Sequence, residues 1–239
     1  MNSTLTLIAI LALAALVHAS FQLSVSVLTL MSGHAIGSRT SHLRLLRITS
    51  GFIFGVFVTT MLVVTFLTYL CLTFYAHLDA RFVWALLSGL MIGLGVAVWL
   101  FYYRRVSGTV LWIPRGMARF LGERAKRTTH ASEGFSLGST SVFAELIFAA
   151  IPAAAAAYSL AALPLPLQLV GIAFYTIVAT LPLIVVYTLI GGGHKLSRIQ
   201  KWREDNKHFL QFAAGSALIV LGFFVYAYEV IGMFATGGA

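Results

Sequence analysis

The sequence predicts an all-α polytopic membrane protein with six transmembrane helices, and three observations support this fold class. The chain of 239 residues is 59% hydrophobic and 10% charged, with a mean hydropathy of +0.93. A typical soluble domain is about 45–50% apolar and about 25% charged, so a soluble globular protein is excluded. Apolar runs of about 20 residues, long enough to cross a bilayer, alternate with charged loops. The cations also collect in alternate loops.

Six apolar runs are each long enough to span the membrane. The first is interpreted as a span rather than a signal peptide, because Met1–Thr4 carries no cation and the run is too long. The loop at 104–138 alternates apolar residues with arginines, which favours a short amphipathic helix on the inner leaflet; a solvated basic loop is the alternative. The predicted spans are 5–31, 49–75, 82–103, 139–161, 166–190 and 209–231.

The distribution of Lys and Arg predicts the orientation. All but one of the 16 lie in the loops between spans 1 and 2, 3 and 4, and 5 and 6; the exception is Arg81. The positive-inside rule then places these loops in the cytoplasm and both termini outside, in a prokaryotic plasma membrane. The net charge of +9 is therefore assigned to topology rather than to nucleic acid. The basic loops are expected to meet the anionic lipid headgroups of the bilayer.

The spans divide into two halves, residues 1–103 and 139–239, on either side of the basic loop at 104–138. Because each half has three spans, the second half enters the membrane from the opposite side. This layout is typical of the 3+3 inverted repeat of small transporters. The alternative is that any six-span protein divides into three and three.

Two ionisable side chains lie deep inside predicted spans, where a charge costs about 2.5–3.5 kcal/mol on insertion scales. Glu145 in span 4 is the stronger candidate for a proton-coupled or solute-binding group. A neutral Glu that clasps a neighbouring helix is the alternative. His18 in span 1 begins a polar stripe with Gln22 and Ser26, and we expect these three residues and Glu145 to form one site. A lone histidine that only packs is the alternative for His18.

Several helix-interrupting and small residues lie in the spans. Pro152 and Pro182 are predicted to break spans 4 and 5 and to free carbonyl groups, with a simple packing kink as the alternative. Gly89-x-x-x-Gly93 and Gly95 are predicted to form a close-packing face in span 3. Polar residues of spans 2 and 5 are expected mainly to form hydrogen bonds between helices, and some of them to line a path: Thr59, Thr60, Thr65, Thr68, Tyr175, Thr176 and Thr180.

The stretch Phe135-Ser136-Leu137-Gly138, followed by Glu145 and Pro152, resembles the start of span 4 in the thiol-disulfide interchange branch of the lysine-exporter superfamily, which includes cytochrome-c-biogenesis membrane proteins. This resemblance implies a six-span inverted repeat with breaks in spans 1 and 4. That branch uses a cysteine in each of those spans. Cys71, the one cysteine here, lies in span 2, so the resemblance implies a transport fold without this redox chemistry.

The sequence therefore predicts a secondary transporter of a small solute or ion, of the export type, with Glu145 as its coupling or binding group. The alternative is a non-transporting membrane subunit or scaffold that docks a partner through the basic loops. An intramembrane enzyme is not expected, because the spans lack H-E-x-x-H, G-x-S-x-G and paired carboxylates. The polar stripe has too few hard ligands for a metal site, and no cofactor is expected. A homo-oligomer is left open.

Overall fold

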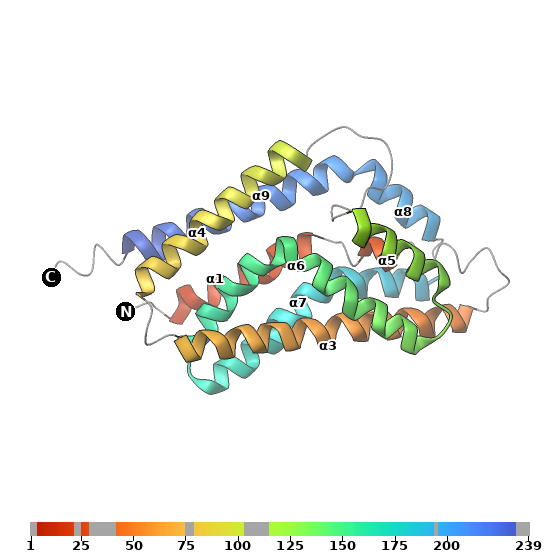
Figure 1. The fold of residues 1–239 in the computed structure, drawn as a ribbon, viewed down its shortest axis with the longest axis horizontal. Helices are drawn as coiled ribbons and strands as arrows, with labels where there is room; N and C mark the ends of the chain where they lie inside the picture. The colour runs from red at the N-terminus through yellow and green to blue at the C-terminus, as the bar shows by residue number, and fades with distance from the viewer. Residues whose placement is uncertain are drawn as a thin grey trace.

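In a computed structural model, the protein is a bundle of long helices, described over residues 4–21, 25–28, 42–74, 79–102, 115–193 and 196–232. These parts of the chain contain no strand. Figure 1 shows the helices running roughly along one long axis. The elements in order are α1 (Thr4–Ser20), α3 (His42–Phe74), α4 (Ala80–Ala97), η1 (Val98–Tyr102), α5 (Arg115–Arg127), α6 (Ala131–Ala161), α7 (Leu165–Gly191), α8 (Leu196–Asp205), α9 (Lys207–Val225) and η2 (Tyr226–Ile231).

Six of the described segments are long and apolar enough to cross a membrane, which confirms the predicted fold class. They are Thr4–Leu28, Leu43–Phe74, Ala80–Phe101, Ala131–Ala161, Leu165–Gly191 and Lys207–Ile231. Large apolar side chains such as Phe54, Leu62 and Phe66 are exposed on the outside of the bundle. A surface of this kind is suited to lipid rather than to water.

Two spans begin more than one helical turn earlier than predicted. The second starts at Leu43 rather than near 49, and the fourth starts at Ala131 rather than near 139. The start of α6 is fixed by Glu133, whose carboxylate accepts hydrogen bonds from the backbone N–H groups of Thr129 at 2.7 Å and His130 at 3.2 Å. These bonds satisfy amide groups that have no partner within the helix. The last residues of the predicted 104–138 loop are therefore helical.

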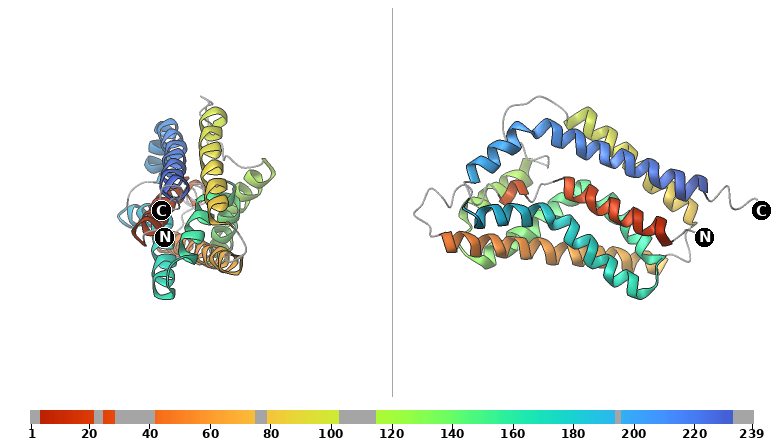
Figure 2. Two further views of the ribbon diagram at one scale, coloured as in Figure 1. Left: turned by 90° about the vertical axis from the view of Figure 1, so that its left-hand side faces the viewer. Right: turned by 180° about the vertical axis from the view of Figure 1, so that it is seen from behind.

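Helix α6 is at the centre of the bundle. Of its most apolar window, 61% is buried, against 33% to 39% for the other spans. Helix α6 packs on α1, α3, α4 and α7. Helices α4 and α9 pack against each other as a pair. Figure 2 shows the α4–α9 pair lying over the layer that contains α3 and α7.

Glycines allow α6 and α3 to approach closely. A Cβ atom at Gly138 would fall on the carbonyl oxygen of Phe52, and one at Gly55 would fall on that of Phe135. Neither position can hold a side chain unless the helices separate. The prediction that Gly89 and Gly93 form a close-packing face is wrong, because a Cβ atom at either position meets nothing within 4 Å. Gly95 does pack closely, against α9.

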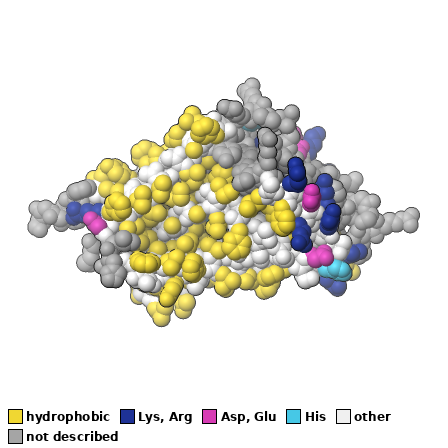
Figure 3. Space-filling model, viewed as in Figure 1, with side chains coloured by type: hydrophobic (Ala, Val, Ile, Leu, Met, Phe, Trp, Pro, Cys, Tyr) yellow, Lys and Arg dark blue, Asp and Glu magenta, His cyan; other side chains and the backbone are white. Residues whose placement is uncertain are grey.

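Most of the charged side chains visible in Figure 3 lie at one end of the molecule. Figure 3 shows Lys, Arg, Asp, Glu and His side chains at the end where α5 lies, with hydrophobic side chains dominating the middle of that face. Helix α5, predicted as an amphipathic helix, is present over Arg115–Arg127, with Leu121 and Ala125 buried. The start of α1 and the end of η2 both lie at the other end, as an even number of spans requires (Figure 1).

Candidate functional site

Two of the predicted site residues, His18 and Glu145, line the same cavity inside the bundle. Glu145 is 5% exposed on α6, and His18 is 6% exposed near the end of α1. The space open to the centre of a water molecule is about 10 Å³, which is roughly what one bound water needs. The other lining residues come from α1, α3, α7 and the segment at 25–28: Ala19, Val25, Val56, Thr60, Ala179, Pro182 and Leu183.

His18 is held by a side chain from another span. Its Nδ1 lies 2.9 Å from the hydroxyl of Tyr175 on α7, and Tyr175 is fully buried. The two rings also touch, with centroids 5.7 Å apart. Glu145 interacts electrostatically with Tyr175 as well. His18, Tyr175 and Glu145 thus bring polar groups from α1, α7 and α6 together in an otherwise apolar core.

Ser26 does not join this group and instead meets a cation from outside the spans. Arg203 on α8 donates a hydrogen bond from Nη2 to the hydroxyl of Ser26 at 2.8 Å. Burial lowers the pKa of Arg203 to about 10, and the negative charge of Glu145 opposes that shift. Arg203 therefore keeps its charge at neutral pH and lies within electrostatic reach of Glu145. Gln22, the fourth predicted site residue, lies outside the described residues.

Pro152 and Pro182 lie inside α6 and α7, and both helices continue past the proline. Pro182 lines the cavity, and the ribbon of α7 changes direction along its length in Figure 2. A proline inside a helix removes one hydrogen bond and bends the helix. Pro152 is buried within α6.

The threonines near the site bond within their own helices, rather than mainly between helices as predicted. Thr176 donates to the carbonyl of Ile172 at 2.8 Å, and Thr180 donates to that of Thr176 at 2.8 Å. Thr60 is 2% exposed and lines the cavity. Within the described ranges, no group of three or more His, Cys, Asp and Glu is placed to hold a metal ion.

Sequence reasoning missed two charged side chains that turn inward, the half-buried Arg203 and the buried Glu229. Arg203 was assigned only to the basic loop between spans 5 and 6, because its position gave no sign that it turns inward. Glu229 is 1% exposed within η2, although it lies close to the end of the last span. The cost of placing a charge inside the membrane applies to Glu229 as it does to Glu145. Only residues deep inside a span were considered from the sequence, and Glu229 was passed over because it lies close to the end of span 6.

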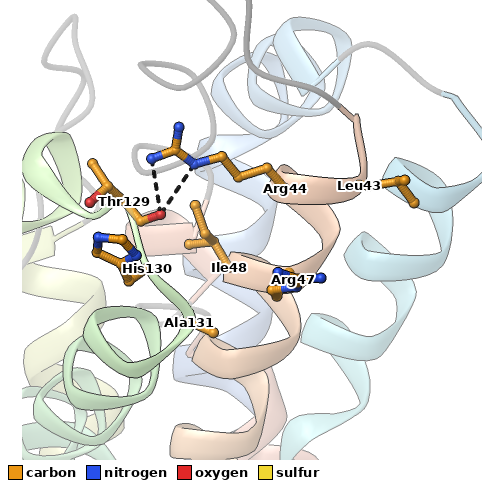
Figure 4. A pocket seen from close by; sticks show the side chains of 7 residues that line it. All are labelled: Leu43, Arg44, Arg47, Ile48, Thr129, His130 and Ala131. Carbon is orange, nitrogen blue, oxygen red and sulfur yellow. Dashed lines mark hydrogen bonds between the residues drawn. The ribbon is translucent and has the colours of Figure 1, made fainter.

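A second cavity lies at the basic end of the bundle, where α3 meets the start of α6 (Figure 4). Its volume is about 310 Å³, and its lining includes Arg44, Arg47 and His130. Arg44 donates from Nε and Nη2 to the carbonyl oxygen of Thr129, each at 3.3 Å. The cavity therefore has two arginine side chains, Arg44 and Arg47, on its α3 side.

Comparison with known proteins finds no match for this chain among protein-family models, curated proteins or solved structures.

Proposed function

We propose that this membrane protein is a secondary transporter of a small solute or ion, with Glu145 as its binding or coupling group. The observation that carries the proposal is the buried carboxyl of Glu145 in a cavity lined by several spans, with His18 beside it. A group that must be neutralised or paired inside the membrane can couple solute binding to a change in charge. Residues that only join two helices do not require a cavity between them.

The arrangement of the helices supports the proposed inverted repeat. An inverted repeat pairs α1 with α6, α3 with α7, and α4 with α9. Under this pairing the α3–α6 contact corresponds to α1–α7, and the α1–α9 contact corresponds to α4–α6. All four contacts occur. The same pairing relates η1 to η2, the two π-helical segments that close spans 3 and 6. In an inverted repeat the substrate site lies between the two halves, where α1 and α6 meet. The resemblance to the lysine-exporter superfamily adds export as the expected direction.

A thermal-shift screen of the purified protein tests the proposal. The panel contains inorganic cations and anions, amines and amino acids, because a solute that binds the native state raises Tm by mass action. We expect a stabilising solute whose effect disappears in Glu145→Gln. The matched control is Glu123→Gln, which changes an exposed acid on α5 and should keep the shift. No stabilising solute, together with a stable co-purified partner, would favour the scaffold function instead.

We also propose that the cavity of Arg44, Arg47 and His130 binds the phosphate of an anionic lipid headgroup. It lies at the basic end of the bundle, and arginines bind phosphate oxygens strongly. Phosphatidylglycerol should therefore raise Tm in detergent more for the wild type than for the Arg44→Gln/Arg47→Gln double variant. Phosphatidylcholine should have no such effect.

Two controls accompany the lipid experiment. Arg119→Gln removes an exposed arginine of α5 outside the cavity and should leave the response to phosphatidylglycerol unchanged. Inorganic phosphate tests whether the headgroup alone is enough. An equal response of the wild type and the double variant to phosphatidylglycerol would remove this site from the account.

A further inference from the structure

Arg203 differs from its neighbours on α8 in the direction of its side chain. Lys201, Trp202, Glu204 and Asp205 are exposed, whereas Arg203 is half-buried and reaches Ser26. Helix α8 connects the fifth and sixth spans at the basic end of the bundle (Figure 1). Arg203, a cation of the connecting helix α8, therefore donates a hydrogen bond to Ser26 near the end of the first span.

Ser26 lies in a short segment that also forms one wall of the Glu145 cavity. Val25 lines that cavity, and Val25, Val27 and Leu28 are all buried. The segment at 25–28 thus contacts the cavity through Val25 and α8 through Ser26. If Arg203 moves away, the segment loses the hydrogen bond that joins Ser26 to α8.

The charges of Glu145 and Arg203 bear on one another. Each would be costly as a lone charge in this environment, because a partly buried ion needs a partner of opposite sign. Because the charge of Glu145 acts on Arg203, moving the arginine away costs less free energy when another cation or a proton takes its place. That dependence links the position of α8 to the occupancy of the cavity.

We propose that Arg203 is a positioning residue, a latch whose hydrogen bond to Ser26 holds the 25–28 segment against the Glu145 cavity on the α8 side. The cavity opens toward α8 when Arg203 is released and a cation or proton takes over its charge. This inference rests on the proposed role of Glu145. It adds a gate, and assigns that gate to a residue of the connecting helix.

Thiol labelling of a buried position tests the latch without a known solute. In a Cys71→Ser background, Thr60→Cys places one thiol on the cavity wall, and mass spectrometry follows its reaction with the cationic reagent 2-(trimethylammonium)ethyl methanethiosulfonate. We expect Arg203→Gln to speed labelling about tenfold, as the loss of a charge-assisted hydrogen bond implies. Arg203→Lys should restore part of the protection.

Matched controls separate opening from general loosening. Val64→Cys lies one turn further along α3, is fully buried, and is not part of the cavity wall, so Arg203→Gln should leave its labelling unchanged. Arg198→Gln removes an exposed arginine of the same α8 helix and should not affect Thr60→Cys. Ser26→Ala keeps all charges and should speed labelling as well.

The outcomes are decisive for the latch and separate from those for the transporter. Unchanged labelling of Thr60→Cys in Arg203→Gln overturns the latch; if that variant does not fold, unchanged labelling in Ser26→Ala overturns it. Equal acceleration at Val64→Cys also overturns it, because the whole core would then have loosened. Loss of solute binding in Glu145→Gln bears only on the proposed function.

Discussion

At the scale of single residues, the central feature is a carboxyl group surrounded by partners from other helices. The insertion cost predicted Glu145 and His18 from the sequence, and both line one cavity. Tyr175 was predicted to bond between helices, and its hydroxyl does so with His18. The same reasoning could not find Arg203, because a long-range partner leaves no local pattern in the sequence. The predicted stripe of His18 and Ser26 is divided between two surroundings, since the helix α1 ends at Ser20 and Ser26 lies in a separate segment.

Removing the hydroxyl of Tyr175 should destabilise the protein. In Tyr175→Phe, the buried His18 loses the hydrogen bond at Nδ1, with an expected loss of about 0.5–2 kcal/mol in the free energy of unfolding, typical of polar contacts between membrane helices. Tm of the detergent-solubilised protein measures this loss. The matched control is Tyr69→Phe, because Tyr69 is 64% exposed. Equal effects of the two variants would show that the His18–Tyr175 bond contributes nothing.

At the scale of elements, hydropathy located all six spans but not all of their starts. The first turns of α6 contain Ser136, Gly134 and Gly138, which lower the hydropathy although the helix is packed tightly on α3. Burial against a neighbouring helix depends on small residues, and a hydropathy average cannot detect it. For the same reason, Gly89-x-x-x-Gly93 fits the packing motif but faces open space, since a motif does not say which face of a helix meets a partner.

Two glycine-to-alanine substitutions should have opposite effects. Gly138→Ala places a methyl group on the backbone of α3 and should cost about 1–3 kcal/mol through overpacking. Gly93→Ala meets no atom within 4 Å and should stabilise α4 by up to about 1 kcal/mol, because alanine favours helix more than glycine does. Tm measures both variants. A larger loss in Gly93→Ala than in Gly138→Ala would contradict the α3–α6 packing.

At the scale of the whole molecule, the alternation of the loops predicts that α5 and α8 lie on the same side of the membrane. Both lie at the end opposite the start of α1 (Figure 1). The sequence predicts this side to be the cytoplasm from the positions of Lys and Arg.

Labelling from one side of the membrane tests this topology. In a Cys71→Ser background, single cysteines at Glu123 on α5, Lys201 on α8 and Arg81 at the start of α4 are exposed to an impermeant maleimide in sealed, oriented vesicles. We expect the α5 and α8 positions to react from the same side and the Arg81 position to react from the other. Labelling of α5 and α8 from opposite sides would exclude the six-span arrangement.

Transport in proteoliposomes is the most direct test of the claim that Glu145 couples solute movement to charge. The protein is reconstituted with the solute that stabilises it, and flux is measured with and without an imposed pH gradient. We predict that Glu145→Gln folds with the Tm of the wild type within a few degrees but loses pH-dependent flux, whereas Glu123→Gln retains it. Unchanged flux in Glu145→Gln, with the same dependence on the gradient, would contradict the account.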